Sequence, residues 1–252
     1  MKFKFLFLLL VLLCFSNCKE EKFTLTKIEG KQIPITDSLE LDPTFDAVIK
    51  PYRDRLQEDM NLVLSYAPET YSKADGDFNT AIGNLMADIV YEQSKDVFKS
   101  RTSNDIDGVL LNHGGIRSII SKGNITTKTA FEIMPFENSI IVVALKGKQI
   151  DSMMHYLARA KRAHPIQGFK LSIDKDYNIV KAQVNGKAID TAKTYYVATN
   201  DYLVNGGDNM NFFARNEGEY PLDYKIRNAL IDYFKKTDTI NPIIDDRFIQ
   251  IK

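Results

Sequence analysis

The chain has 252 residues, and its 33 lysines and arginines are balanced by 33 aspartates and glutamates. Because no excess of positive charge exists to attract a polyphosphate backbone, we expect no binding to a nucleic-acid polymer. Hydrophobic residues make up 44% and charged residues 26% of the sequence, which excludes a disordered chain and a polytopic membrane protein. The length predicts one compact domain or a small pair.

The first eighteen residues read as a targeting segment. Two lysines fall within the first four residues, residues 3–13 are apolar apart from one lysine, and the sequence turns charged directly after Cys18. This pattern resembles a bacterial lipoprotein signal with lipidation at Cys18; Cys14 is the weaker candidate because a large leucine precedes it. We therefore expect residues 1–18 to be a lipoprotein signal peptide. Simple signal cleavage is the alternative.

An exported chain that is lipid-anchored in the cell envelope follows from this interpretation. The sequence Lys19-Glu20-Glu21 after the cysteine resembles a tag that directs some lipoproteins to the cell surface. Residues 19–40 show no sustained periodicity and are expected to form a polar tether, whereas residues 41–252 are expected to form the folded domain.

Helices and strands are mixed along the rest of the chain. The first helix is expected from Pro43, with a buried face made of Phe45, Val48, Ile49, Tyr52 and Leu56. The other expected elements, in chain order, are a strand at 61–66, a helix at 79–98, a strand at 108–111, a helix at 127–134, a strand at 139–145, a helix at 149–160, strands at 168–174, 178–184 and 195–198, a helix at 222–234 and a strand at 247–251. This mixture predicts an α+β fold, with a mixed β-sheet flanked by helices.

Common catalytic and cofactor motifs are absent from the sequence. Both cysteines precede residue 19, which leaves no thiolate metal site or thiol nucleophile in the body of the chain. The three histidines, His113, His155 and His164, are too few and too scattered for a two-metal phosphoesterase centre. The segment from Asp75 begins like a calcium loop, but Thr80 stands where that loop requires glycine. We expect no metal or cofactor site in this chain.

Three short segments are the candidates for function. They are Asn112-His113-Gly114-Gly115-Ile116-Arg117, Pro135-Phe136-Glu137-Asn138, and the run from Asn200 to Asn209 that contains Gly206-Gly207-Asp208. Each alone is explained by ordinary turn chemistry. In this order they resemble the C-terminal domain of the 5'-nucleotidase family, whose substrate-binding signatures are Asn-x-Gly-Gly-x-Arg, Pro-Phe-x-Asn and Gly-Gly-Asp-Gly. The resemblance covers about residues 45–215.

The resemblance implies roles for individual residues. Phe136 and Tyr202 match the two aromatic side chains that clamp a nucleobase, Asp208 matches the carboxylate that binds the ribose hydroxyls, and Arg117 matches an arginine that faces the phosphate. Further polar contacts are implied for Asn112, Gly114 and Asn138. The competing interpretations are two core aromatic residues, a capping aspartate and a surface arginine.

Some positions depart from the family pattern. Family members bring further arginine from the region of the helix at 79–98, but no arginine lies between Arg55 and Arg101 here, so phosphate affinity is expected to be lower. Tyr202 replaces a familiar phenylalanine and Asn209 a familiar glycine. His113 also stands where glycine is common, and we interpret it as a turn residue.

Complete enzymes of the family carry an N-terminal metallophosphoesterase domain, and the residues before 45 are too few to form one. The first hypothesis is therefore the nucleotide-binding half of a 5'-nucleotidase-type hydrolase. A separately encoded metallophosphoesterase would supply the divalent metals, and this chain alone would be inactive. The alternatives are a non-catalytic nucleoside-binding lipoprotein and a relic fold kept as an interaction surface.

Overall fold

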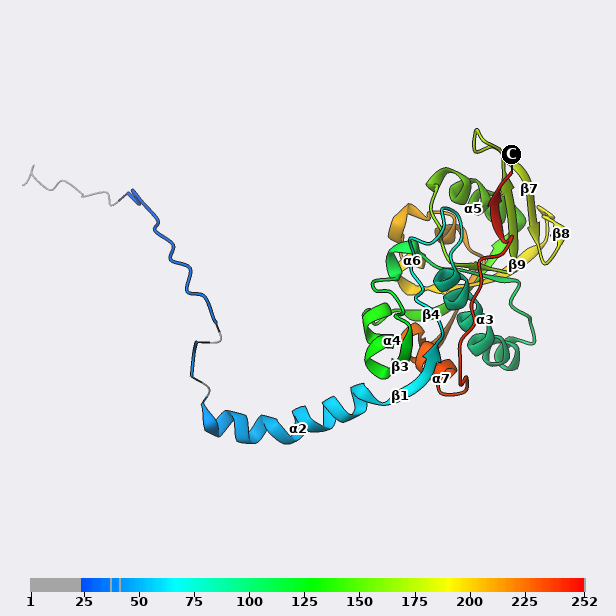
Figure 1. The fold of residues 1–252 in the computed structure, drawn as a ribbon. Helices are drawn as coiled ribbons and strands as arrows, with labels where there is room; N and C mark the ends of the chain where they lie inside the picture. Colours follow the sequence, from blue (N-terminus) through cyan, green and yellow to red (C-terminus); the bar gives the residue numbers. More distant parts are fainter. Residues whose placement is uncertain (1–23, 37, 41, 252) are drawn as a thin grey trace, which may run out of the picture. The chain divides into compact units, whose positions relative to one another are not determined.

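The computed structural model describes residues 24–36, 38–40 and 42–251 (Figure 1). The chain divides into two compact units between Val48 and Ile49. Residues 24–36 of the first unit are exposed and contain neither helix nor strand. The expected signal peptide and Cys18 lie outside the described residues, and the expected boundaries of the tether and the domain stay predictions.

Helix α2 (Pro43–Asn61) begins where the sequence predicts it. Its predicted buried face is wrong, since no residue of α2 is buried and Phe45 and Tyr52 are 69% and 76% exposed. Val48, Ile49 and Leu56 are exposed as well. Periodicity shows which side chains share a face of a helix, but it does not show that another element covers that face. Within the described part of the chain, no helix is both long enough and apolar enough to span a membrane.

The second unit contains the remaining helices and the strands. The α-helices are α3 (Ala81–Thr102), α4 (Thr127–Ile133), α5 (Gly147–Ala160), α6 (Asp201–Val204) and α7 (Ile226–Phe234), and the short 3-10 helices are η1 (His113–Gly115), η2 (Gly207–Asn209) and η3 (Phe213–Arg215). The strands are β1 (Val63–Ala67), β2 (Gly108–Leu110), β3 (Gly123–Thr126), β4 (Ser139–Lys146), β5 (Ile166–Gln167), β6 (Phe169–Ile173), β7 (Ile179–Val184), β8 (Lys187–Ala188), β9 (Thr194–Asn200), β10 (Gly218–Lys225) and β11 (Phe248–Gln250).

The described strands form three sheets. The central sheet has the order β10-β4-β9-β2-β5, in which β2 and β9 run parallel and the other neighbours antiparallel. A second sheet has the order β11-β6-β7-β8, and β1 pairs with β3. The predicted α+β fold with a mixed sheet flanked by helices is confirmed.

The central sheet is buried on both faces. Along β4, Val142 packs into the hydrophobic cluster that includes α3 and α7, whereas Val143 and Leu145 pack into the cluster that includes α5 and the second sheet. Successive side chains of a strand point to opposite faces. Strand β4 therefore reads as a continuous apolar run and not as an alternating one.

Three strand ends meet at one edge of the central sheet. Strand β2 is parallel to β9, so both end at the same edge. Strand β4 is antiparallel to β9 and pairs Ile140 with Asn200, so β4 begins where β9 ends. Asn112, Asn138 and Asp201 lie within two residues of these ends. The topology therefore gathers the three sequence segments singled out above.

The sequence prediction differs most near the C-terminus. Helical spacing predicts a helix over 222–234, but α7 begins only at Ile226, because residues 218–225 form the edge strand β10. Pro221 lies in this strand, and proline is tolerated at a sheet edge, where its missing N–H is not needed. The register shifts between Pro221 and Lys225, and Asp223 has a left-handed φ of 55°. The short strands β3, β5 and β8 also lie outside the predicted elements.

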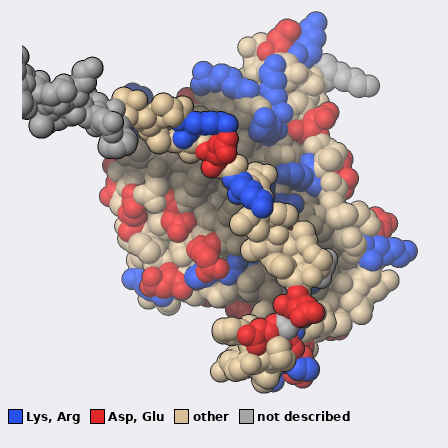
Figure 2. Space-filling view, turned by 90° about the vertical axis from the view of Figure 1, so that its left-hand side faces the viewer, with Lys and Arg blue, Asp and Glu red and all other residues tan. Residues whose placement is uncertain are grey.

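Charged side chains of both signs cover the face shown in Figure 2, in line with the balanced net charge.

Arg247 ties the C-terminal segment to the body of the second unit. Its side chain is only 14% exposed and donates hydrogen bonds to Asp88 Oδ1 at 2.9 Å, to Asp245 Oδ1 at 2.9 Å and to the Ile166 carbonyl at 2.7 Å. Burial without such partners would be costly for a guanidinium.

We expect Arg247→Met to lower the free energy of unfolding by about 2–4 kcal/mol, because it leaves two carboxylates without their partner. Urea denaturation measures this change. The control is Arg101→Met, since Arg101 is 47% exposed and its exposed ion pair contributes about 0–1 kcal/mol. Equal losses in the two variants would contradict the role of Arg247.

Candidate functional site

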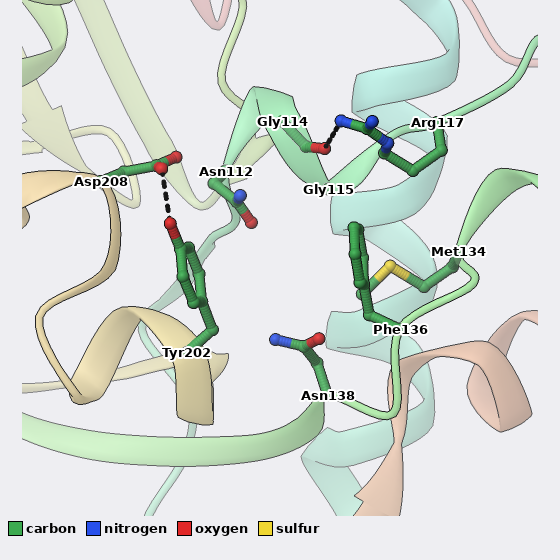
Figure 3. A pocket seen from close by; sticks show the side chains of 9 residues that line it. All are labelled: Asn112, Gly114, Gly115, Arg117, Met134, Phe136, Asn138, Tyr202 and Asp208. Carbon is green, nitrogen blue, oxygen red and sulfur yellow. Dashed lines mark hydrogen bonds between the residues drawn. The ribbon is translucent and has the colours of Figure 1, made fainter. Parts of the chain in front are cut away.

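A pocket of about 310 Å³ lies at the edge of the central sheet where the three strand ends meet (Figure 3). The residues that line it are Asn112, Gly114, Gly115, Arg117, Met134, Phe136, Asn138, Tyr202 and Asp208. The structure thus brings all seven sequence-predicted site residues together. Gly115 and Met134 line the pocket as well, although they are not among the predicted site residues.

The two aromatic rings face the pocket from opposite sides. Figure 3 shows Phe136 on one side and Tyr202 on the other, and no ring contact joins them. Phe136 is 43% and Tyr202 46% exposed, so their interpretation as core residues is wrong. A flat group could enter between the rings and contact both.

A charged clamp from α7 holds the loop that carries Phe136. The buried Arg227 side chain donates hydrogen bonds to the carbonyls of Pro135 at 3.3 Å and Phe136 at 3.4 Å, and it also pairs with Glu137. Lys225 forms a second ion pair with Glu137. The hydrogen bonds from Arg227 and then Lys225 lower the pKa of Glu137 to about 2. No sequence pattern marks this clamp, because the partners lie 90 residues apart.

Tyr202 lies against the backbone of the glycine turn. A Cβ atom added to Gly207 would lie 2.4 Å from Tyr202 Cε1, so only glycine allows this approach. Gly206 has a left-handed φ of 92°, which glycine adopts without strain. Tyr202 lies in α6, and Asn200 caps the start of this helix by accepting a hydrogen bond from the backbone N–H of Leu203 at 2.9 Å.

Asp208 is fixed through both its side chain and its main chain. Its Oδ1 accepts a hydrogen bond from the Tyr202 hydroxyl at 3.0 Å, and its carbonyl accepts one from the Tyr156 hydroxyl at 2.9 Å. Burial and then the charge of Asp208 raise the pKa of Tyr156, which keeps this hydroxyl a donor. Asp208 and Asn209 both have left-handed φ angles, of 51° and 57°. Asn209 therefore adopts the left-handed conformation at the position where the family signature has glycine.

Arg117 lies at the rim beside Phe136. Its Nη1 donates to the Gly114 carbonyl at 3.4 Å, and its guanidinium carbon is 5.9 Å from the centre of the Phe136 ring. Its backbone N–H donates to the Ile133 carbonyl at 2.9 Å, which ties the turn to the end of α4. The remaining guanidinium donors can reach an anion in the pocket.

Asn112 lies deeper and is 9% exposed, and its Oδ1 would lie 3.0 Å from a Cβ atom added to Gly115. The pocket thus combines two aromatic faces, one carboxylate, one guanidinium and the amides of Asn112 and Asn138. These are groups that bind a ring, hydroxyls and an anion.

The donor set does not fit a divalent metal. Over the residues that the structure describes, no group of three or more histidine, cysteine, aspartate or glutamate side chains could hold an ion. Asp208 is the only carboxylate among the pocket residues.

Comparison with known proteins gives a family for this arrangement. The family model described as "5'-nucleotidase, C-terminal domain" matches residues 65–215, which is more than half of the chain. The chain belongs to this family. The matched residues include all seven predicted site residues.

Individual relatives agree with this assignment. This 5'-nucleotidase C-terminal domain protein is 27% identical over 240 residues to the trifunctional nucleotide phosphoesterase protein YfkN of Bacillus subtilis, covering 87% of the chain and 16% of that protein. It is 25% identical over 260 residues to a 5'-nucleotidase-related protein of Glossina morsitans morsitans, covering 90% of the chain and 45% of that protein.

Among solved structures, the 5'-nucleotidase precursor of Thermus thermophilus has the same fold, with a TM-score of 0.70 and 22% identity. The match covers 83% of the chain and 43% of that structure. The chain thus spans less than half the length of each of these three relatives.

The ion pairs of the clamp on the Phe136 loop predict that Glu137 titrates well below the ordinary pKa of a glutamate. Because the pKa of Glu137 is about 2 in the fold against an ordinary 4.5, the clamp stabilises the fold fully above about pH 4.5 and is lost as the pH falls toward 2. A carboxyl NMR titration should give a Glu137 midpoint near 2. Lys225→Gln should raise this midpoint, and a wild-type midpoint near 4.5 would contradict the clamp.

Proposed function

We propose that this chain binds nucleosides and nucleotides in the pocket of Figure 3 and acts as the substrate-binding half of a 5'-nucleotidase-type phosphohydrolase, with a role in nucleotide catabolism. The observation that carries this proposal is the pair of half-exposed rings on opposite sides of one pocket, with Asp208 at its border. The family to which the chain belongs supports it.

The nucleobase would stack between Phe136 and Tyr202. Each such contact contributes about 1–3 kcal/mol and accepts any base, because every base has a π face. One oxygen of Asp208 is engaged by Tyr202, so the ribose hydroxyls would donate to the other. Arg117 would meet the phosphate at the rim.

Hydrolysis would depend on a second protein. A separately encoded metallophosphoesterase would contribute divalent metals and the attacking water, and this chain would hold the phosphate ester within reach of that centre. A lipid anchor at Cys18 would keep the chain in the cell envelope and raise the effective concentration of two partners anchored in one membrane.

A non-catalytic nucleoside-binding role is the second candidate. By the family resemblance, further phosphate-binding arginine is expected near the start of α3, where this chain has Phe78, Ile82 and Met86. Ile82 and Met86 are buried in the hydrophobic core, and Phe78 packs on Phe248. This favours a ligand held by its base and ribose.

Calorimetric titration with adenosine tests the pocket. We expect Phe136→Ala and Tyr202→Ala each to weaken binding at least about fivefold, because each removes one stacking face, whereas Tyr202→Phe keeps the ring and changes affinity less. Tyr52→Ala is the control, since Tyr52 is exposed and does not line the pocket. No heat of binding with adenosine or AMP would leave only the relic interpretation.

Phosphate release from AMP separates the two candidates. We expect no turnover by the chain alone with divalent metals, and turnover when a partner metallophosphoesterase is added. Asp208→Ala should reduce the rate of the mixture. Binding of adenosine without turnover in the mixture would select the non-catalytic role. Turnover by the chain alone at a rate unaffected by Asp208→Ala would contradict the proposal.

A further inference from the structure

A second pocket, of about 570 Å³, adjoins the first and shares Gly114 and Asp208 with it. Its other lining residues include two arginines, Arg159 and Arg162, and two histidines, His113 and His164. Arg159, Arg162 and His164 lie outside the three sequence segments that match the family signatures. His113 lies within the first segment, at a position where the family signature commonly has glycine. The role of this pocket is therefore not explained by the resemblance.

The end of α5 places the two arginines at one pocket. The helix ends at Ala160, and Lys161 adopts a left-handed conformation with φ 51° and ψ 43° that turns the chain. The Lys161 ammonium lies 3.4 Å from the centre of the Tyr177 ring. Lys161 is thus engaged elsewhere, while Arg159 and Arg162 before and after it both line the pocket.

Most of the guanidinium donors are available to a ligand. Arg159 Nε donates to the His155 carbonyl at 3.2 Å. In the described part of the chain, neither Arg159 nor Arg162 forms an ion pair, and the Arg162 side chain has no hydrogen-bond partner. A cation near a helix C-terminus is favoured by the helix dipole, and this explains the single contact of Arg159. The helix dipole does not explain the position of Arg162, which lies beyond the end of α5.

His164 is a fixed and neutral side chain of this pocket. His164 Nδ1 accepts a hydrogen bond from the backbone N–H of His113 at 3.2 Å, which assigns the proton of the neutral His164 ring to Nε2. Burial, followed by the neighbouring His113, lowers the pKa of His164 to about 4. His113 Nδ1 in turn donates to the Ala163 carbonyl at 3.1 Å. The two arginines therefore carry positive charge in this pocket, whereas His164 carries none at neutral pH.

One acidic residue opposes them. Asp208 is the only acidic residue among those that line this pocket. Its carboxylate accepts a hydrogen bond from the hydroxyl of Tyr202, which lines the first pocket, and its backbone carbonyl accepts one from the hydroxyl of Tyr156. Two guanidiniums against one carboxylate leave a net positive charge. A guanidinium fork matches the paired oxygens of a phosphate better than it matches a halide.

We propose that the second pocket is an oxyanion subsite in which Arg159 and Arg162 bind a phosphate group beside the nucleoside pocket. The phosphate could be free or part of a nucleotide that spans both pockets, and only the second source rests on the proposed function. The subsite would supply basic side chains that the start of α3 does not.

Titration of inorganic phosphate into the ¹⁵N-labelled full chain tests this. We expect saturable amide shifts around the second pocket and binding weakened at least about tenfold in the Arg159→Gln/Arg162→Gln variant, because charged hydrogen bonds are lost. The matched control is Lys175→Gln/Lys181→Gln, which removes two exposed positive charges from the β6–β7 hairpin. Unchanged amide spectra elsewhere verify the fold of both variants.

The absence of saturable shifts, or equal phosphate affinity in the two double variants, would overturn the subsite. Comparison of adenosine 3',5'-bisphosphate with AMP identifies the source. If the bisphosphate loses affinity in the arginine variant together with free phosphate, while AMP does not, the ligand spans both pockets. If free phosphate alone loses affinity, the subsite binds the free ion. Adenosine affinity is measured in parallel, so loss of the nucleoside pocket and loss of the subsite are distinguishable.

Discussion

The antiparallel pairing of β4 with β9 is the constraint on which the site depends. Seven residue pairs join the two strands, from Ile140 with Asn200 to Lys146 with Thr194. This register fixes the start of β4 beside the end of β9, and the parallel pairing of β2 with β9 adds the end of β2. A shift by one residue would turn every side chain of β4 to the opposite face and separate the loops. Burial of both faces makes such a shift costly.

The two rings of the pocket are supported in different ways. The Phe136 loop is held by the buried guanidinium of Arg227 in α7 and by a second ion pair from Lys225 at the end of β10, whereas Tyr202 rests on a glycine backbone and on the carboxylate of Asp208. The first support is electrostatic and acts on the backbone of the loop. The second combines a close contact with the glycine backbone and a hydrogen bond to Asp208, and it acts on the tyrosine side chain itself. The tyrosine hydroxyl couples the Tyr202 ring to the carboxylate of Asp208, a link that phenylalanine would lack.

Much of the fold and of the site could be predicted from the sequence. The helical spacing of apolar residues located α3 and an apolar run located β4, and the residues of the three signature segments converge in one pocket. The interpretation of α2 was wrong because its periodicity does not reveal that its apolar side chains are exposed. Part of strand β10 reads as helix, since Leu222 and Ile226 have a helical spacing while they lie in a strand and a helix respectively.

Features that depend on contacts between residues far apart in the sequence could not be predicted. Arg227 and Glu137 are 90 residues apart in the sequence, and each reads there as an ordinary surface charge. The sequence around either residue does not indicate that they form an ion pair. The second pocket depends on the left-handed turn at Lys161, a conformation that lysine seldom adopts.

Arg227 also links the interior of the domain to the shape of its pocket. It projects from α7, whose Leu230 and Phe234 are packed in the same cluster as α3. A small rotation of α7 would therefore move the carbonyls of Pro135 and Phe136 with it. Repacking of that interior would therefore shift the loop that carries Phe136 and change the spacing between the two rings, without any substitution among the residues that line the pocket.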